Sequence, residues 1–368
     1  MRICRVIGLG VAGILFAGAA PAFGQEIPAA PPPDEFFRGL VMAVTAEQEQ
    51  TIAGASQIEQ TVTVRLDGNG GTVVEAAYTD VMGAERARVL RPGDRVVVAR
   101  AQDLGQTAYY VVDRYRLPPI IMMALLFVVM TVAFSRVRGL SSLVGLAITV
   151  VVLVQFIVPR ILAGDNPLVI TVGGALVIAF VSIYLAHGFN RRTTIAVAGT
   201  LITLGIAAGL AIAFVSLAAL FGAGSEEAFY LQLGLQVVNL RGLLLGGIIL
   251  GALGVLDDIT TGQAAAVQEI SLANPQLGPR ELYRRGLSVG TEHITALVNT
   301  LFLAYAGASL PLFILFTVNV DQPMWVTVNS EFVAEEIVRT LVGSSALVLA
   351  VPITTLLASR LLRARPRE

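Results

Sequence analysis

Long runs without charged residues dominate the chain from residue 117 onward. Residues 117–135, 139–159 and 193–225 contain no Asp, Glu, Arg or His, and residues 166–190 contain only His187. A helix needs about 20 apolar residues to cross the ~30 Å hydrocarbon core of a bilayer. The whole set of runs predicts seven transmembrane helices, at about residues 117–135, 139–159, 167–187, 193–221, 240–256, 293–317 and 338–360.

The segment before these runs has a different pattern. Short stretches alternate between apolar and polar residues, and glycine-rich turns such as residues 67–71 separate them. Alternation with a period of two is typical of strands that bury one face. Residues 36–116 are therefore predicted to form a small all-β domain, either an OB-like barrel or a sandwich. The alternating stretches lie at residues 61–66, 73–78, 95–98 and 109–115.

The first 25 residues have the pattern of a secretory signal peptide. Arg2 and Arg5 precede an apolar run over residues 6–20, and small residues follow it. That run is shorter than the ~20 residues of a spanning helix, although an uncleaved anchor remains the alternative. The proline-rich residues 26–35 then predict a stiff linker. The predicted fold class is an all-α polytopic membrane bundle preceded by a small exported all-β domain.

Arginines are concentrated in alternate connections between the predicted helices. By the positive-inside rule these connections are cytoplasmic, together with the tail at residues 363–368. The β domain then lies outside an inner or plasma membrane, which agrees independently with a signal peptide. The opposite connections hold Arg160 and several acids. The arginines that set this orientation are Arg136, Arg138, Arg191, Arg192, Arg280, Arg284, Arg285, Arg360, Arg363, Arg365 and Arg367.

The composition excludes several classes of protein. Of the 368 residues, 55% are hydrophobic and 14% are charged, whereas soluble domains carry about 25% charged residues. All 25 basic residues are arginine, so lysine chemistry is absent, and a net charge of −1 argues against nucleic-acid binding. One cysteine and two histidines exclude cysteine-rich metal sites. We expect no enzyme activity, no cofactor and no resident metal.

The fifth predicted helix is unusually short. Only 15 residues separate Arg241 from Asp257, and they rise about 22 Å. One of these charged ends is therefore expected to lie below the membrane surface. The helix also carries small residues that suit close packing against neighbouring helices, and packing alone is a sufficient explanation for them. These residues are Gly242, Gly246, Gly247, Gly251 and Gly254.

Carboxylates and polar residues near the fifth and sixth predicted helices could line a transport path. The polar stripe after Asp258 predicts either a re-entrant segment or a solvated surface helix over residues 257–272. Glu292 shares a helix face with Asn299, and an acid at membrane depth usually marks a pathway. Four carboxylates are expected to converge near the cytoplasmic mouth, where they would suit a cation or a proton relay. The pathway candidates are Asp257, Asp258, Glu269, Glu292, His293, Asn299 and Thr300.

Two other matches carry no chemistry in this context. Residues 286–290 fit the G-x-S-x-G pattern of a nucleophile elbow, but that motif needs a turn between a strand and a helix. Here the motif lies in a predicted cytoplasmic loop that leads into a helix. His187 stands at an arginine-rich helix end, where an interfacial role is expected rather than a ligand role.

The second half of the chain resembles the YibE/F-like family of bacterial multi-pass membrane proteins. The resemblance lies in several blocks and their spacing, and the β domain before the first helix is also similar to family members. It implies a permease-like architecture and no particular substrate. One departure is Thr291-Glu292, where many members have Arg-Asp. The matching blocks lie at residues 251–258, at Glu269 with Asn274-Pro275, and at residues 299–309, 336–343 and 351–354.

Two functions follow as hypotheses. The first is a permease that moves a small solute or cation through a carboxylate-lined path in the bilayer. The second is a non-transporting scaffold or sensor whose β domain binds an envelope protein, with a homo-oligomer as a further possible assembly. The two differ in whether the acids within the membrane are needed for function.

Overall fold

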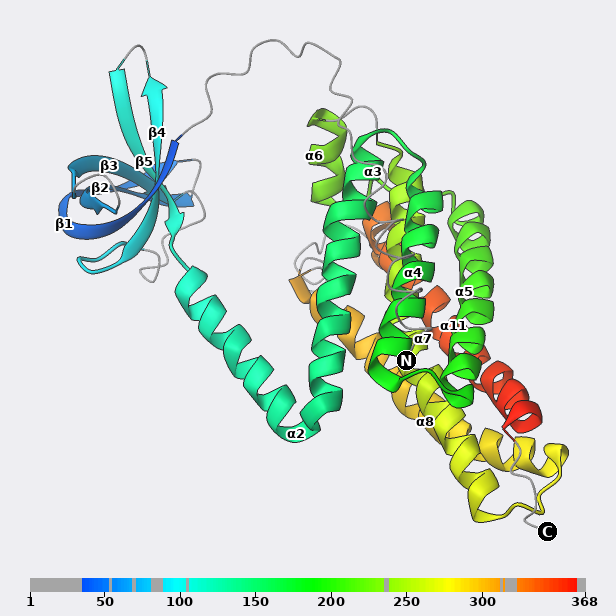
Figure 1. Ribbon diagram of the computed structural model, residues 1–368. Coiled ribbons are helices and arrows are strands. Elements are labelled where there is room, and N and C mark those ends of the chain that lie inside the picture. Colours follow the sequence, from blue (N-terminus) through cyan, green and yellow to red (C-terminus); the bar gives the residue numbers. More distant parts are fainter. Residues whose placement is uncertain are drawn as a thin grey trace. The chain divides into compact units, whose positions relative to one another are not determined.

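The computed structural model describes residues 35–52, 55–67, 71–80, 89–103, 106–234, 238–311, 314 and 323–362. These residues divide into two compact units, one that contains the β domain and ends at Met130, and a helical one from Thr131 onward (Figure 1). The predicted signal peptide, nearly all of the linker and the C-terminal tail lie outside the described residues.

The β domain is a closed five-stranded barrel. The strands follow the order β1-β2-β3-β5-β4 around the barrel, and all neighbouring pairs are antiparallel except β3 and β5. This confirms the predicted small barrel and rules out the sandwich alternative. The strands are β1 (Glu35–Ile52), β2 (Ala55–Leu66), β3 (Val73–Asp80), β4 (Arg95–Asp103) and β5 (Gln106–Arg114).

The alternating pattern of the sequence fills the barrel interior. Val62, Val64 and Leu66 of β2 are almost fully buried, whereas Arg65 between them is exposed. The long first strand pairs with both β2 and β4, and its register with β2 shifts on either side of Val44. Such bulges bend a strand strongly, which allows β1 to close the barrel on both sides.

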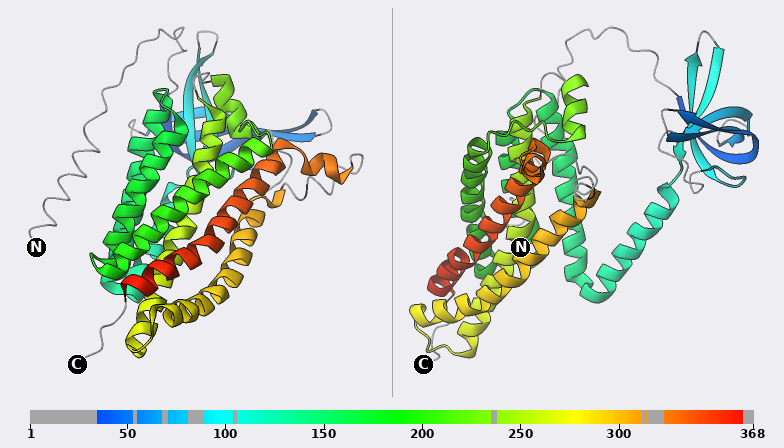
Figure 2. Two further views of the ribbon diagram at one scale, coloured as in Figure 1. Left: turned by 90° about the vertical axis from the view of Figure 1, so that its right-hand side faces the viewer. Right: turned by 180° about the vertical axis from the view of Figure 1, so that it is seen from behind.

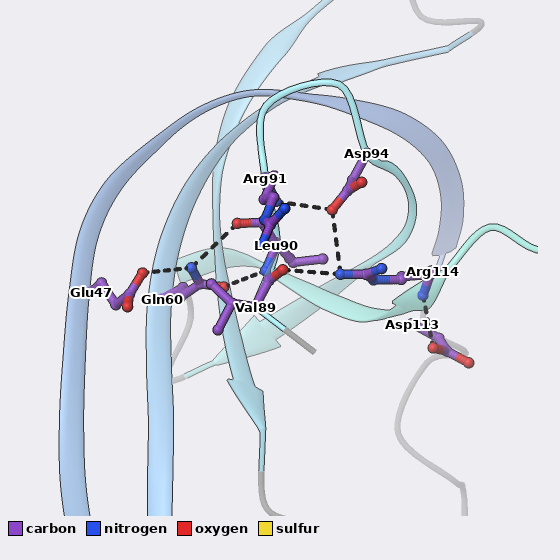
Figure 3. A network of polar contacts seen from close by, with 8 residues as sticks. All are labelled: Glu47, Gln60, Val89, Leu90, Arg91, Asp94, Asp113 and Arg114. Atoms are coloured by element: carbon purple, nitrogen blue, oxygen red, sulfur yellow. Dashed lines mark hydrogen bonds and ion pairs between the residues drawn. The ribbon is translucent and has the colours of Figure 1, made fainter. Parts of the chain in front are cut away.

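A buried glutamine fastens the segment that precedes β4 to the barrel (Figure 3). Gln60 is 1% exposed, and its Oε1 accepts a hydrogen bond of 2.8 Å from the backbone N–H of Leu90. Its Nε2 donates to Glu47 Oε2 at 3.0 Å and to the Leu90 carbonyl at 3.4 Å. Arg114 adds a bond of 2.9 Å to the carbonyl of Val89. Both ends of the Gln60 amide are therefore satisfied, and Leu90 is held inside the barrel.

The helical unit begins within a helix that is broken at one residue. Arg136 has φ 52° and ψ −130°, so residues 117–135 and 137–152 form separate helices within α2. A π-helical turn then precedes Pro159, which cannot donate a helix hydrogen bond. The helices are α2 (Leu117–Val152), the π-helix η1 (Leu153–Ile157), α3 (Val158–Leu162), α4 (Pro167–His187), α5 (Arg191–Leu217), α6 (Glu226–Gly234), α7 (Leu240–Ala273), α8 (Pro279–Ala308), α10 (Met324–Val328) and α11 (Glu331–Leu361).

Five helical stretches in the described chain are long and apolar enough to cross a membrane. They are residues 117–162, taken as one stretch, and helices α4, α5, α7 and α11. α8 is not among them, since its first turns carry charges. Both Arg285 and Arg284 contact Glu281 at 2.9 Å and hold the pKa of its carboxyl below the ordinary value. The structure therefore supports a membrane protein, and the count of seven helices stays a prediction.

α7 and α8 are longer than the sequence pattern predicts. α7 does not end at Asp257 but continues without a break to Ala273, where Asn274-Pro275 follows. Residues 257–272 are thus the second half of one 34-residue helix, about 51 Å long. The turn between α7 and α8 lies beyond the end of α4 (Figure 2). Charged side chains do not end a helix, whereas the residue before a proline disfavours helical geometry.

The core of the bundle contains α4, α5, α7 and α11. Asparagine side chains cap the start of three of these helices. The Oδ1 atoms of Asn166, Asn190 and Asn239 accept bonds of 3.0 Å from the backbone N–H groups of Leu168, Thr193 and Gly242, respectively. Such caps satisfy backbone N–H groups that have no partner within the helix. The helix starts are therefore fixed by the sequence at these points.

A loop after α5 binds the first turns of α11 through its backbone. Glu331 Oε1 accepts hydrogen bonds from the N–H groups of residues 221, 222 and 223 at 2.6, 2.9 and 3.4 Å. Glu335 Oε1 accepts a fourth, from Gly224 N at 3.0 Å. We call this contact the Glu331 latch. It joins two helices that are more than 100 residues apart in the sequence.

Candidate functional site

A pocket of about 190 Å³ opens where α4 ends and α5 begins, beside the middle of α7. It contains a carboxylate from α7, a guanidinium from α5 and an imidazole from α4, so it offers charges of both signs to a polar ligand. Its lining residues are His187, Arg192, Thr193, Ala196, Asp258, Thr261, Gly262 and Ala265.

Contacts with α4 give the depth of Asp258 in the bundle. A Cβ on Gly246 would lie 2.7 Å from Thr171 Oγ1, and one on Gly242 would lie 3.2 Å from Pro167 Cδ. Both pairs differ by 75 in residue number (246 − 171 and 242 − 167), so α4 and α7 run in the same direction. At that offset Asp258 is level with residue 183, one turn before α4 ends. The carboxylate therefore lies beside an apolar helix.

Contacts between α5 and α7 place Asp258 at the same level of the bundle. Thr260 touches Thr200, and Arg241 Nη2 donates to Ser216 Oγ at 2.8 Å, so α5 and α7 run in opposite directions. Asp258 lies two residues from Thr260 and is thus beside the uncharged part of α5. Acids at such a depth are costly unless they face water or a partner. The pocket provides that access for Asp258.

A layer of buried polar side chains begins at the wall of this pocket. The hydroxyls of Thr200 and Thr260 lie 2.6 Å apart, and both residues are 0% exposed. The Thr200 hydroxyl also donates to the carbonyl of Ala196, a residue that lines the pocket. We use the name polar layer for the fully buried residues Thr200, Thr260, Gln263, Thr354 and Thr355.

Gln263 connects three helices within the polar layer. Its Nε2 donates to the Gly286 carbonyl of α8 at 2.8 Å and to Thr355 Oγ1 of α11 at 2.7 Å. Because a carbonyl only accepts, this arrangement fixes which end of the amide is nitrogen. The Thr355 hydroxyl itself donates a hydrogen bond of 2.6 Å to the Val351 carbonyl. Gln263 Oε1 and Thr354 Oγ1 have no hydrogen-bond partner among the described residues.

Glycines on the neighbouring helices make room for the polar layer. A Cβ on Gly290 would lie 2.9 Å from both polar atoms of the Gln263 side chain, and one on Gly286 would lie 2.9 Å from Thr355 Cγ2. A Cβ on Gly199 would lie 2.5 Å from Thr354 Oγ1. Gly286 and Gly290 are the two glycines of the G-x-S-x-G match, and they lie within the continuous helix α8. Their role in the structure is close packing.

The other predicted pathway residues do not gather around Asp258. The backbone carbonyl of Asp257 accepts a bond of 2.9 Å from Thr261, and its side chain is half-buried. Among the described residues, no three acids or histidines come close enough to share an ion. The expected convergence of four carboxylates is therefore not found. The side chains of Glu269 on α7 and of Glu292, His293, Asn299 and Thr300 on α8 are all exposed.

The predicted packing glycines of α7 fall into two groups. Gly242 and Gly246 pack against α4, and a Cβ on Gly251 would lie 3.0 Å from the Tyr305 hydroxyl. A Cβ added to Gly247 or to Gly254 would have no described atom within 4 Å. Close packing therefore explains three of the five.

The polar layer was missed because each of its members is ordinary in isolation. Threonine hydroxyls can bond to their own helix, as that of Thr203 does to the Gly199 carbonyl at 2.8 Å. A usable signal was present in α7, since Thr260, Gln263 and Ser271 share one helical face and are all buried. That face of α7 differs from the face that carries Asp258 and Glu269, on which the predicted pathway was placed.

Comparisons with known proteins identify the family. No curated protein and no solved structure matches the chain. A family model described as YibE/F-like protein matches residues 123–364, which include the second part of α2, the pocket and the polar layer. Because this match covers well over half of the 368 residues, the chain belongs to the YibE/F-like protein family.

Proposed function

We propose that the protein is a multi-pass permease of the inner or plasma membrane, which moves a small solute or cation past Asp258 and through the polar layer. The observation that carries this proposal is the pocket that holds Asp258, Arg192 and His187, beside which the fully buried hydroxyls of Thr200 and Thr260 lie 2.6 Å apart. Buried polar groups cost free energy in a membrane bundle, so a connected set of them is a mark of function.

The charges of the pocket suit it as an entrance. Asp258 faces the same cavity as Arg192 and His187, so a polar or charged solute finds a partner of either sign before it meets the apolar core. Uncharged hydroxyl and amide groups follow, and these can replace the hydration shell of a solute without the cost of a buried charge. The exposed Glu292 of α8 has no part in this route.

The membrane topology belongs to the same proposal. The break at Arg136 is compatible with two crossings in residues 117–162, and the uncharged second half of α8 with one more. Seven crossings would place the barrel and the C-terminus on opposite sides. In a Cys4→Ser background, an impermeant thiol reagent should label Gly71→Cys on intact cells and should not reach Ala364→Cys. Labelling of position 364 alone would contradict the orientation.

The test of transport uses a matched pair of acids on α7. Both side chains are exposed, but Asp258→Asn removes a charge that lines the pocket, whereas Glu269→Gln removes one outside it, three turns further along the same helix. Solute and ion contents of a deletion strain identify what the protein moves, and complementation then compares the two variants. We expect Asp258→Asn to lose the complementing activity and Glu269→Gln to keep it, at equal membrane levels. Full activity of Asp258→Asn would exclude this route.

The scaffold or sensor function remains the second candidate because of the barrel surface. Phe36, Val73 and Val112 are each more than half exposed, and exposed apolar side chains can mark a surface that binds a partner. A scaffold predicts that Asp258→Asn complements fully while Phe36→Ser does not. A permease predicts the reverse.

A further inference from the structure

We propose that the pocket beside Asp258 binds a small, elongated zwitterion, such as an ω-amino acid, between Asp258 and Arg192. This names the class of solute for the permease, and its transport rests on the proposed function, whereas its binding does not. Both side chains line one cavity of about 190 Å³. Among the described residues, neither the Asp258 carboxylate nor the Arg192 guanidinium forms an ion pair or a side-chain hydrogen bond.

Both charges lie near the same imidazole. His187 stands at the end of α4 and lines the pocket together with Asp258 of α7 and Arg192 of α5. Each of the two charges interacts electrostatically with the His187 ring. The acid and the base therefore flank the same space, although they come from different helices and do not pair with each other.

The two charges lie at different levels of that cavity. Thr200 of α5 contacts Thr260 of α7, and the two helices run in opposite directions. Asp258, two residues before Thr260, is therefore level with the residue two positions after Thr200. Arg192 is ten residues from that level, or about 15 Å along the helix axis between Cα atoms. The two side chains span part of this distance, so the ligand that meets both must be longer than an α-amino acid, whose charges are on adjacent carbons.

The wall between the two charges is uncharged and made of small residues. Ala196 of α5 and both Gly262 and Ala265 of α7 line the pocket between these levels. Such residues can contact methylene groups and offer no partner to a further charge. Thr193 and Thr261 add one hydroxyl near each end. An ω-amino acid has the same order of groups, with a short methylene chain between two charged ends.

A ligand with a single charge fits this cavity less well. A cation beside Asp258 would leave Arg192 unpaired, and an anion beside Arg192 would leave Asp258 unpaired. An unpaired charge that loses water costs free energy, whereas a zwitterion pairs both charges at once. The cavity is also smaller than the ~300–1,000 Å³ of sites for drug-sized ligands. The pocket therefore suits a compact solute whose net charge is zero.

The test measures binding without transport, on the purified full-length protein in detergent. 5-Aminopentanoate is compared with pentanoate and pentylamine, which each keep one of its two charges, and with glycine, whose charges are close together. A ligand that binds only the folded state raises the thermal midpoint once its concentration exceeds Kd. At equal pH and ionic strength, we expect 5-aminopentanoate to raise the midpoint by a few degrees more than the other three.

Single-residue variants assign each end of the ligand. Asp258→Asn should remove the advantage of 5-aminopentanoate over pentanoate, because the ammonium group loses its partner. Arg192→Gln should remove its advantage over pentylamine, because the carboxylate loses its partner. Glu269→Gln and Arg191→Gln are the matched controls, since both residues are exposed and lie outside the pocket. If one charge variant does not fold, the other decides, because each tests one end.

The outcomes separate the site from the permease. Equal midpoints with the zwitterion and its single-charge analogues, a larger rise with glycine, or an advantage that survives both charge variants would overturn the proposed ligand. An advantage of 5-aminopentanoate that each variant removes at its own end supports it. If it binds but vesicles that contain the protein accumulate none of it, the site stands and the permease proposal fails. If complementation requires Asp258 while no zwitterion binds, the permease stands and this ligand class fails.

Discussion

The two units of the molecule each bury one glutamine, and the two residues are satisfied differently. Gln60 in the barrel has a partner for its oxygen and two for its nitrogen. Gln263 in the bundle has two partners for its nitrogen and none for its oxygen among the described residues. Their exposed fractions are 1% and 0%, so burial alone does not distinguish them.

The partners of each amide explain what it does. Gln60 bonds to both the N–H and the carbonyl of Leu90, a residue that lies outside the described strands. Gln263 bonds to Gly286, whose carbonyl already lies in a helix and has a donor there. The first glutamine therefore supplies hydrogen bonds that the backbone needs, whereas the second bonds to backbone that already has its hydrogen-bond partners. Comparing the two separates a structural amide from one available to a ligand.

The largest expected effect is that of Gln60→Leu in the barrel. This change leaves the N–H of Leu90 buried without a partner, which costs about 1–3 kcal/mol, and it also releases Glu47. We expect residues 35–116 to fold alone and the variant to lose about 2–4 kcal/mol in a urea titration. Gln102→Leu, at an exposed position, is the control and should change stability by less than about 0.5 kcal/mol. Equal losses would contradict the assigned role of Gln60.

Gly290→Ala should have the next largest effect. The added methyl group would lie 2.9 Å from the Gln263 amide, and overpacking of this kind costs about 1–3 kcal/mol. The thermal midpoint of the detergent-solubilised protein should fall. Gly254→Ala is matched to it, because that helical glycine has open space around it and alanine is the better helix former. A fall in both variants would show that the space around the polar layer is not special.

Gln263→Leu should change stability much less than Gln60→Leu. The Gly286 carbonyl keeps its helix donor, and the Thr355 hydroxyl keeps its bond to Val351. We expect a loss below about 1 kcal/mol, seen as a small shift of the thermal midpoint. A loss as large as that of Gln60→Leu would show that both glutamines are structural and would remove the contrast between them.

The smallest expected effect is the pH dependence of an ion pair at the end of the barrel. Arg116 lies 2.5 Å from Asp113 at the end of the barrel and lowers the pKa of that carboxyl below its ordinary value. Because the folded-state pKa is lowered, the stabilisation is present above the ordinary pKa and is lost as the pH falls through the lowered one. Both side chains are more than half exposed, so the gain is about 0.5 kcal/mol or less. Urea titrations between pH 7 and 2 should show that this part of the unfolding free energy is present in the wild-type barrel at pH 7 and is absent in Arg116→Gln.

The placement of the helices could be predicted because charges are costly in lipid. The uncharged run that ends at His187 gave the bounds of α4, and the alternation of valines in β2 gave the barrel core. The extent of α7 could not be predicted from charge. Asp257 and Asp258 interrupt an apolar run but not a helix, and the helix ends only before Asn274-Pro275.

The site was only partly predictable for a related reason. Asp258 was expected in a polar setting, and it lies in the pocket. Glu292 was expected beside it, since helical spacing shows which residues share a face but not which neighbour that face meets. The partner of Gln263 on α11 is 92 residues away, and nothing local indicates it.

The Glu331 latch has a consequence for how this protein can change over evolution. The loop contributes backbone N–H groups and no side chains, so any residue except proline supplies the same contact at positions 221 and 223. Gly222 is different, because its φ of 84° favours glycine. Selection would then act on the acid of α11 and leave most of the loop free to drift. Substitutions at the two ends of this contact would not be correlated, although the contact joins two helices of the bundle.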